Sequence, residues 1–276
     1  MSRRTVTIQY EDTMKPVWIL GPCAIDNREL YFSIAEHLNG FMGDRYWFYK
    51  ASFDKANRTS LYGNRGVGLE ESLEIFKDIK VSFPNIKLTT DVHEVWQVEK
   101  LSPYIDAIQI PAFLCRQTDL ITECAKNFDI VNVKKGQWLG PNNLVESIDK
   151  IKETNPSTQA WICDRGSSFG YDKLIVDFTI VDELKKYYDR VILDCTHSTQ
   201  RSRKIYGLQG DRKLAGRYLL SSSIFNYDGV FAETHPKPEE SASDGDCQII
   251  LSGLQNLIEK SELIGAQNET CRLKSS

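Results

Sequence analysis

The sequence predicts an α/β protein folded as a (β/α)8 barrel. Eight short apolar runs alternate with eight longer amphipathic stretches, and the length of 276 residues is close to the roughly 250 typical of such a barrel. No segment with the composition of a linker interrupts the alternation, so we expect residues 1–276 to form a single barrel domain. An open, doubly wound sheet is the competing architecture.

The predicted strands are short apolar runs, most of which end on a polar residue. They cover residues 17–23, 46–52, 87–91, 107–112, 130–134, 160–165, 190–197 and 229–235. Helix-like patterning between them predicts helices over 27–40, 69–82, 94–101, 118–127, 142–153, 176–188, 212–223 and 249–264. A further short strand over 5–10 would form a small β-hairpin that caps the barrel at its N-terminal side.

Composition excludes several classes of protein. The net charge of −4 argues against binding nucleic acid through an overall basic surface. The seven cysteines are scattered, without CxxC spacing, and several fall in apolar runs, as buried thiols do in a reducing cytoplasm. The first 16 residues lack the apolar run of a secretory signal, and no segment reaches the roughly 20 apolar residues of a membrane helix. We therefore expect a cytoplasmic protein with no nucleic-acid or membrane partner.

The ends of the strands carry the chemistry of a (β/α)8 barrel, because the active site lies at their C-terminal side. In the run 130–134, Asn132 and Lys134 share one face and Val131 and Val133 the other, so the polar pair is expected to point into the barrel. The same alternation places Gln109 inward. The predicted strand ends are Cys23, Lys50, Asp91, Gln109, Lys134, Arg165, His197 and Glu233.

A cluster of cations is the first candidate site. One lysine at a strand end is readily explained as a solvated rim residue, but several together repel one another unless anions offset the charge. Phosphate and carboxylate groups are the natural ligands of such a cluster. Lys135 falls on the opposite face and is expected to be a structural or rim residue. The cluster consists of Lys50, Lys55, Arg58, Arg116, Lys134 and Arg165.

A metal site is the second candidate. Barrel closure would bring the first, seventh and eighth strands together, and with them Cys23, His197 and Glu233. Asp244 or Asp246 would supply a fourth ligand, and His235 competes with His197. Each residue alone also fits a structural role. Thiolate, imidazole and carboxylate together suit zinc, iron(II) or manganese rather than calcium or magnesium.

These residues lie in segments that together resemble the 3-deoxy-D-manno-octulosonate 8-phosphate synthase family. The segments are GPCAIDN, KASFDKANRTS, TTDVHE, IQIPAFLCRQTDL, VNVKKGQ, CDRGSSFGYD, DCTHS and AETHPKP followed by SDG. The resemblance implies a (β/α)8 barrel, usually a homotetramer. Members of that family condense phosphoenolpyruvate with D-arabinose 5-phosphate and water, a step in making the lipopolysaccharide sugar Kdo.

The resemblance also implies roles for individual residues. Phosphoenolpyruvate would be held by Lys55, Lys134 and Arg165 with help from Gln109, and Lys50 would lie beside the reacting carbons. Arabinose 5-phosphate would contact Asn57 and Arg58, and Arg116 would reach the sugar phosphate in an adjacent subunit. The candidate catalytic residues are Lys50, Asp91 and Lys134.

Cysteine in the first strand is the mark of the metal-dependent class of this family. His197, Glu233 and Asp244 match the other ligands implied by the resemblance, and Asp246 does not. The segment 198–228 departs from the family pattern, so its role as a lid or in sugar-phosphate contacts is left open.

Three alternatives remain. A 3-deoxy-D-arabino-heptulosonate 7-phosphate synthase would use erythrose 4-phosphate on the same barrel, but that family carries a KPRTS-type motif where this chain has KANRTS. A sibling synthase could use another aldose phosphate. A barrel without catalysis, serving as a scaffold, is the third alternative, and the retained metal and cation positions argue against it.

Overall fold

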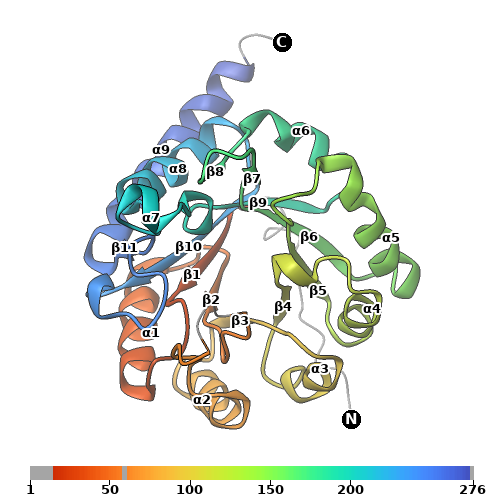
Figure 1. Cartoon of the computed structure of the whole chain (residues 1–276), viewed down its shortest axis with the longest axis vertical. Helices are drawn as coiled ribbons and strands as arrows, with labels where there is room; N and C mark the ends of the chain where they lie inside the picture. The colour runs from red at the N-terminus through yellow and green to blue at the C-terminus, as the bar shows by residue number, and fades with distance from the viewer. Residues whose placement is uncertain (1–14, 58–60, 274–276) are drawn as a thin grey trace.

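Eight parallel strands close into a barrel (Figure 1), as predicted. Their order is β1-β2-β3-β4-β5-β6-β9-β10, and β1 pairs with β10 as well as with β2, which excludes the open sheet. The computed structural model describes residues 15–57 and 61–273, with side chains to residue 268; the predicted hairpin over 5–10 lies outside them. The barrel strands are β1 (Val17–Gly21), β2 (Trp47–Lys50), β3 (Lys87–Asp91), β4 (Ala107–Ile110), β5 (Ile130–Lys134), β6 (Gln159–Asp164), β9 (Arg190–Asp194) and β10 (Gly229–His235).

Helices surround the barrel and cover the outer face of the sheet (Figure 1). Most begin within three residues of the predicted start, because their apolar residues recur at helical spacing and bury one face. The helices are α1 (Arg28–Met42), α2 (Leu69–Ser82), α3 (Val95–Leu101), α4 (Thr118–Asn127), α5 (Val145–Thr154), α6 (Val181–Leu184), α7 (Arg203–Tyr206), α8 (Arg212–Ile224) and α9 (Leu251–Leu273). In the described part of the chain, none is both long and apolar enough to cross a membrane.

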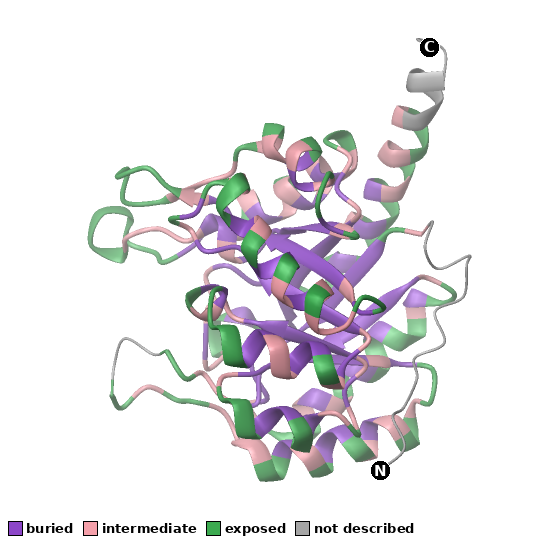
Figure 2. Ribbon diagram, turned by 90° about the vertical axis from the view of Figure 1, so that its right-hand side faces the viewer, coloured by how far each residue is buried: buried purple, intermediate pink, exposed green. Residues whose placement is uncertain are grey.

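Large side chains fill the interior of the barrel below the strand ends. Trp161 packs edge-on against Phe48 and Tyr46, with ring centroids 5.6 and 6.3 Å apart. Because successive inward residues are two positions apart, the next inward residue after Phe48 is Lys50, and the next after Phe231 is Glu233. An apolar layer therefore forms the floor on which the polar strand ends stand. Figure 2 shows the same concentration of buried residues along the strands.

The structure corrects the prediction between β6 and β9. The predicted helix over 176–188 is wrong in extent: the chain forms a 3-10 turn at Phe178–Ile180 and then only α6. The β-branched and aromatic run before α6 has low helix propensity, and the side chain of Asp177 accepts a hydrogen bond from the Thr179 amide, which favours a turn. A hairpin of β7 (Ser167–Ser168) and β8 (Leu174–Ile175), not predicted, precedes it.

Other boundaries shift by a few residues. The strand predicted to end at His197 ends at Asp194, and His197 begins a 3-10 turn. The short strand β11 (Ile249–Ile250) pairs with β10, and α9 runs beyond the predicted 264. Gly21 lies where a Cβ would be 2.0 Å from the Lys50 carbonyl oxygen, so only glycine permits this approach of β1 to β2 just before Cys23.

Candidate active site

The strand ends open into a cavity of about 980 Å³ at the C-terminal side of the barrel. It is within the size range of small-molecule sites. Arg58 lies outside the described residues, Cys23 and Glu233 are buried beneath the cavity, and Arg116 does not line it. The predicted residues that do line it are Lys50, Lys55, Asn57, Asp91, Gln109, Lys134, Arg165, His197 and Asp244.

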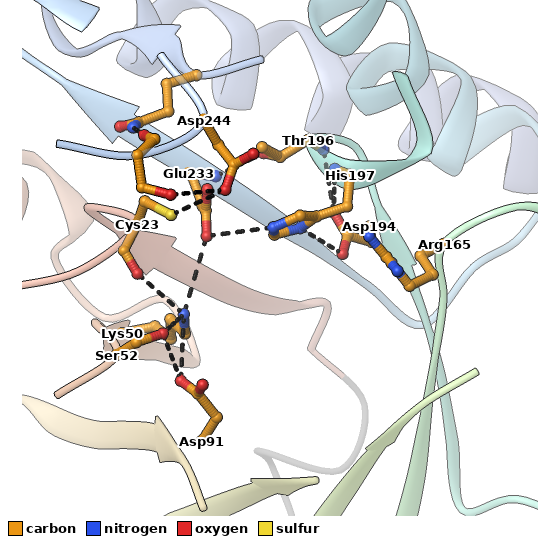
Figure 3. A network of polar contacts seen from close by, with 12 residues as sticks. Cys23, Lys50, Ser52, Asp91, Arg165, Asp194, Thr196, His197, Glu233 and Asp244 are labelled. Carbon is orange, nitrogen blue, oxygen red and sulfur yellow. Dashed lines mark hydrogen bonds and ion pairs between the residues drawn. The ribbon is translucent and has the colours of Figure 1, made fainter. Parts of the chain in front are cut away.

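Three of the predicted metal ligands form one compact group (Figure 3). Cys23, Glu233 and Asp244 each offer a ligand atom, and these atoms all lie within 4.8 Å of one another. Cys23 follows β1, Glu233 lies on β10, and the direct pairing of Gly21 with Glu233 in the sheet explains why they meet. Asp244 comes from the loop after β10, where it adopts a left-handed backbone conformation with φ of 51°. Aspartate tolerates this conformation better than most residues.

His197 adjoins this group through Glu233. Its Nε2 atom lies 3.6 Å from Glu233 Oε1, while Nδ1 lies 2.9 Å from Asp194 Oδ2. Asp194 also accepts a hydrogen bond from the His197 amide at 2.8 Å. A carboxylate on one ring nitrogen, with the other nitrogen directed at a ligand site, is the usual arrangement around a metal-binding histidine.

The donor set fits a divalent transition metal. Both carboxylate oxygens of Glu233 are buried and accept no hydrogen bond from any residue that the structure describes. Burial raises the pKa of the Cys23 thiol well above its ordinary value, and the negative charge of Glu233 adds to this. A cation among these atoms would satisfy the Glu233 oxygens and stabilise the thiolate. Sulfur, nitrogen and carboxylate oxygen are donors that zinc and iron accept.

Lys50 connects the ligand group to the opposite wall of the cavity. Its Nζ atom donates to Ser52 Oγ at 2.9 Å and lies 3.5 Å from Asp91 Oδ1 and 3.8 Å from Glu233 Oε1. Burial raises the pKa of Asp91, but Lys50 and the hydrogen bond from His93 outweigh it and hold that pKa well below its usual range. Asp91 is therefore a carboxylate at neutral pH, positioned by Ser52 and His93.

Lys134 lies on the neighbouring wall. Its Nζ atom donates to Asp194 Oδ2 at 2.6 Å and stands 3.2 Å from the centroid of the Phe231 ring. Burial raises the pKa of Asp194, yet His197 and Lys134 hold it well below its ordinary value. Asp194 thus contacts both His197, which adjoins the Cys23, Glu233 and Asp244 group, and Lys134 on the neighbouring wall of the cavity.

Arg165 and Lys55 complete the positive wall. Arg165 donates to Gln200 Oε1 at 2.7 Å, and Gln200 in turn donates to Asp244 Oδ1 at 3.4 Å. Burial by itself would lower the pKa of Lys55. The negative charges of Cys23 and the surrounding carboxylates outweigh this and raise the pKa above its ordinary value, so Lys55 remains an ammonium. The amide oxygen of Gln109 is buried and has no hydrogen-bond partner among the described residues.

The alternative metal ligands, Asp246 and His235, do not belong to the group formed by Cys23, Glu233 and Asp244. Asp246 lies 3.3 Å from Arg203 and accepts from the Gln209 amide, away from the Cys23 group. The Nδ1 atom of His235 accepts a hydrogen bond from the Lys237 amide at 3.0 Å, and His235 is not in the ligand group. Lys135 is fully buried 3.5 Å from Asp164, outside the cavity lining.

Arg116 lies on the surface of this chain. Its guanidinium donates to Glu146 Oε2 at 2.7 Å, and the two side chains are 57% and 61% exposed. Charge alone grouped it with the other cations, but the structure does not bring it to the cavity of its own chain.

Sequence reasoning missed Asp194, Ser52 and Gln200. Asp194 was detectable, because it stands two residues after Ile192 on the inward face of a predicted strand. Ser52 and Gln200 carry no such signal. They lie beyond the strand ends, and their roles depend on the contacts that the loops make.

Comparisons with known proteins show the family to which this chain belongs. The sequence pattern of the DAHP synthetase I family matches residues 5–267. Proteins named 2-dehydro-3-deoxyphosphooctonate aldolase are similar over most of their length. That of Fusobacterium nucleatum is 40% identical over 88% of this chain and 87% of its own. That of Wolinella succinogenes is 41% identical over 88% and 96%, and that of Helicobacter pylori 40% over 93% and 97%. The chain belongs to the DAHP synthetase I family and, within it, to the 2-dehydro-3-deoxyphosphooctonate aldolases, which confirms the predicted family.

Proposed function

We propose that this chain condenses phosphoenolpyruvate with D-arabinose 5-phosphate and water, giving 3-deoxy-D-manno-octulosonate 8-phosphate and inorganic phosphate. The observation that supports it most directly is the cavity lined by the cations Lys55, Lys134 and Arg165 and by Asp244, with Cys23 and Glu233 buried beneath it. Two phosphorylated substrates need such cations, and an aldehyde or water needs an activating group near them. The reaction supplies the biosynthesis of Kdo and lipopolysaccharide.

The positive wall would bind and orient phosphoenolpyruvate. Lys134 and Arg165 offer donors to its phosphate and carboxylate groups, with Lys55 at the rim and Gln109 beside them. Asn57 and Arg58, with Arg116 from an adjacent subunit, would hold the sugar phosphate. Arabinose 5-phosphate would then lie between the loop that carries Asn57 and Arg58 and the group formed by Cys23, Glu233 and Asp244.

In the reaction, C3 of the enol attacks the aldehyde carbon of the sugar, and water adds at C2 of the former enol. The resulting hemiketal phosphate collapses to the keto acid and releases phosphate. Lys50, in reach of both Asp91 and Glu233, would stabilise the negative charge that develops on the aldehyde oxygen as the new carbon–carbon bond forms. Asp91 would orient Lys50 through Ser52.

A divalent metal would be held by Cys23, His197, Glu233 and Asp244, with zinc, iron(II) and manganese as the candidates. When bound, it supplies a Lewis acid that polarises the aldehyde or the water. Asp194 would orient His197 for this role. The described cysteines are all free and buried, which supports a reducing cytoplasm as the compartment. We also propose a homotetramer, in which the exposed Arg116 serves a neighbouring site.

A substrate assay tests the proposal and separates it from the sibling reaction. Purified protein is mixed with phosphoenolpyruvate and, in turn, with arabinose 5-phosphate, erythrose 4-phosphate and ribose 5-phosphate, and phosphate release is followed. We expect release with arabinose 5-phosphate far above the others. Preference for erythrose 4-phosphate would identify a heptulosonate phosphate synthase, and no release with any sugar would point to a barrel without catalysis.

A further inference from the structure

A second cavity lies beside the main one, between the β7–β8 hairpin, the turn after β9 and the start of α8. Its volume is about 390 Å³, large enough for a small organic ligand. The two cavities are adjacent, because Lys173, Leu174 and Arg201 line both. The polar lining consists mainly of Lys173, Ser198, Arg201, Lys213 and Arg217.

The charge on this lining is strongly positive. Four cations, Lys173, Arg201, Lys213 and Arg217, face a single carboxylate on the described lining, that of Asp211. Asp211 lies 3.3 Å from Arg201, whereas the other three cations form no ion pair within the part of the chain that the structure describes. Lys173, Lys213 and Arg217 are exposed, so solvent screens part of their mutual repulsion, and an anion in the cavity would offset the rest.

Two polar atoms on the lining lack partners. Ser198 is completely buried, and its hydroxyl makes no hydrogen bond with any described residue. The Nε atom of Arg201 is likewise buried and unpartnered within the described chain. Buried polar atoms almost always have a partner. Because both residues line the cavity, a small rotation of either side chain would present its polar atom to an acceptor bound there.

We propose that this cavity binds the phosphate group of a phosphate monoester or of inorganic phosphate. Arginine and lysine donors together with a serine hydroxyl match the oxygens of a phosphate dianion. The apolar sides of Leu174, Leu214 and Tyr206 complete the wall and favour an organic monoester over the free ion.

This site goes beyond the proposed reaction. Lys213 and Arg217 line this cavity and not the main one. A site in this position therefore adds a further phosphate-binding place to a chain whose main cavity is proposed to hold two phosphorylated substrates.

Calorimetric titration with inorganic phosphate and, separately, with glycerol 3-phosphate tests the site. The proteins are the native chain, the double variant Lys213→Glu with Arg217→Glu, and the control Lys260→Glu, which removes an exposed lysine on α9 that lines neither cavity. Both target residues are exposed, so circular dichroism should show an unchanged fold. A neutral pair, Lys213→Gln with Arg217→Gln, serves if the double charge reversal unfolds the protein.

We expect the double variant to bind one phosphate or glycerol phosphate fewer per chain than the native protein and the control. The result does not depend on turnover, because it is a difference in stoichiometry between proteins that share the same main cavity. Equal stoichiometry in the native chain and the double variant would overturn the site, even if the condensation itself is demonstrated. A loss in the control as large as in the double variant would also overturn it.

Discussion

The sulfur of Cys23 lies 3.3 Å from the Oδ2 atom of Asp244, although 221 positions separate the two residues in the chain. The contact exists because β1 and β10 are neighbours where the barrel closes, and because the loop after β10 folds back over that seam. A thiol and a carboxylate in contact, above a buried Glu233 with unsatisfied oxygens, make a site that a cation would stabilise.

Replacing Cys23 tests the metal site directly. We expect Cys23→Ala to lose both its metal and its turnover, because the thiolate is the soft donor of the group. Elemental analysis of the purified protein measures the metal, and phosphate release measures turnover. The control is Cys124→Ala, a buried cysteine on the outer side of the barrel. Full activity in metal-free native protein would contradict the prediction.

Asp194 is expected to act through His197 and Lys134 rather than on substrate. Asp194→Asn keeps the shape but weakens the contacts with His197 Nδ1 and Lys134 Nζ. Loss of such an orienting carboxylate lowers metal affinity by about 10- to 100-fold. Competition with a chelator of known affinity measures the change. An unchanged metal affinity, with Asp189→Asn as the surface control, would rule out this role.

Lys134 and Lys135 are adjacent but should respond in opposite ways. Lys134→Met is expected to lower kcat and raise KM for phosphoenolpyruvate, since Lys134 lines the cavity. Lys135→Met leaves Asp164 buried without its ion-pair partner, which costs about 3–5 kcal/mol of stability. Lys134→Met also breaks a buried ion pair, but Asp194 keeps its hydrogen bonds with the amide and ring of His197, so we expect a smaller loss of stability there. Steady-state kinetics and urea unfolding of both variants separate the two effects. If both variants showed the same changes in kinetics and in unfolding free energy, the direction in which each lysine points would not separate a catalytic role from a structural one.

The low pKa of Asp91 predicts a pH-dependent contribution to stability. Its carboxylate is favoured in the folded state, so the contribution is fully present above the unfolded pKa of about 3.9 and is lost as pH falls towards the folded value. In that window the unfolded state binds more protons, and the unfolding free energy rises with pH. Urea unfolding from pH 6 down to the acid limit should show the native advantage over Asp91→Asn shrinking as pH falls. If the difference in unfolding free energy between the native protein and Asp91→Asn did not change with pH, as we expect for the surface variant Asp78→Asn, the prediction would be contradicted.

Arg116 tests whether sites are shared between subunits. A hydrogen bond to a charged group contributes roughly 1.5–3 kcal/mol, so Arg116→Ala should raise KM for arabinose 5-phosphate about 10- to 100-fold. Mixing Arg116→Ala chains with Lys134→Met chains during refolding should recover activity, because one chain supplies Lys134 and its neighbour supplies Arg116. No recovery in mixed oligomers would place the effect of Arg116 within a single chain.

Much of this molecule could be predicted from the sequence because it rests on local periodicity. The alternation of apolar runs and amphipathic stretches predicted the eight strands of the barrel, and period-two facing placed Gln109 and Lys134 inside it. The same rule put Lys135 on the other face, where the structure pairs it with Asp164. The helix predicted over 176–188 is wrong in extent because a capped 3-10 turn at Phe178–Ile180 competes with its first turns.

Only the tertiary structure decided which charged residues meet. Sequence grouped Arg116 with Lys134 and left Asp246 beside Asp244, yet Arg116 pairs with Glu146 on the surface and Asp246 turns to Arg203. These outcomes depend on barrel closure and on loop conformations, which bring together residues far apart in the chain and leave no local pattern. The bridging carboxylate of Asp194 and the second, positively charged cavity became visible for the same reason, once strands and loops had fixed positions.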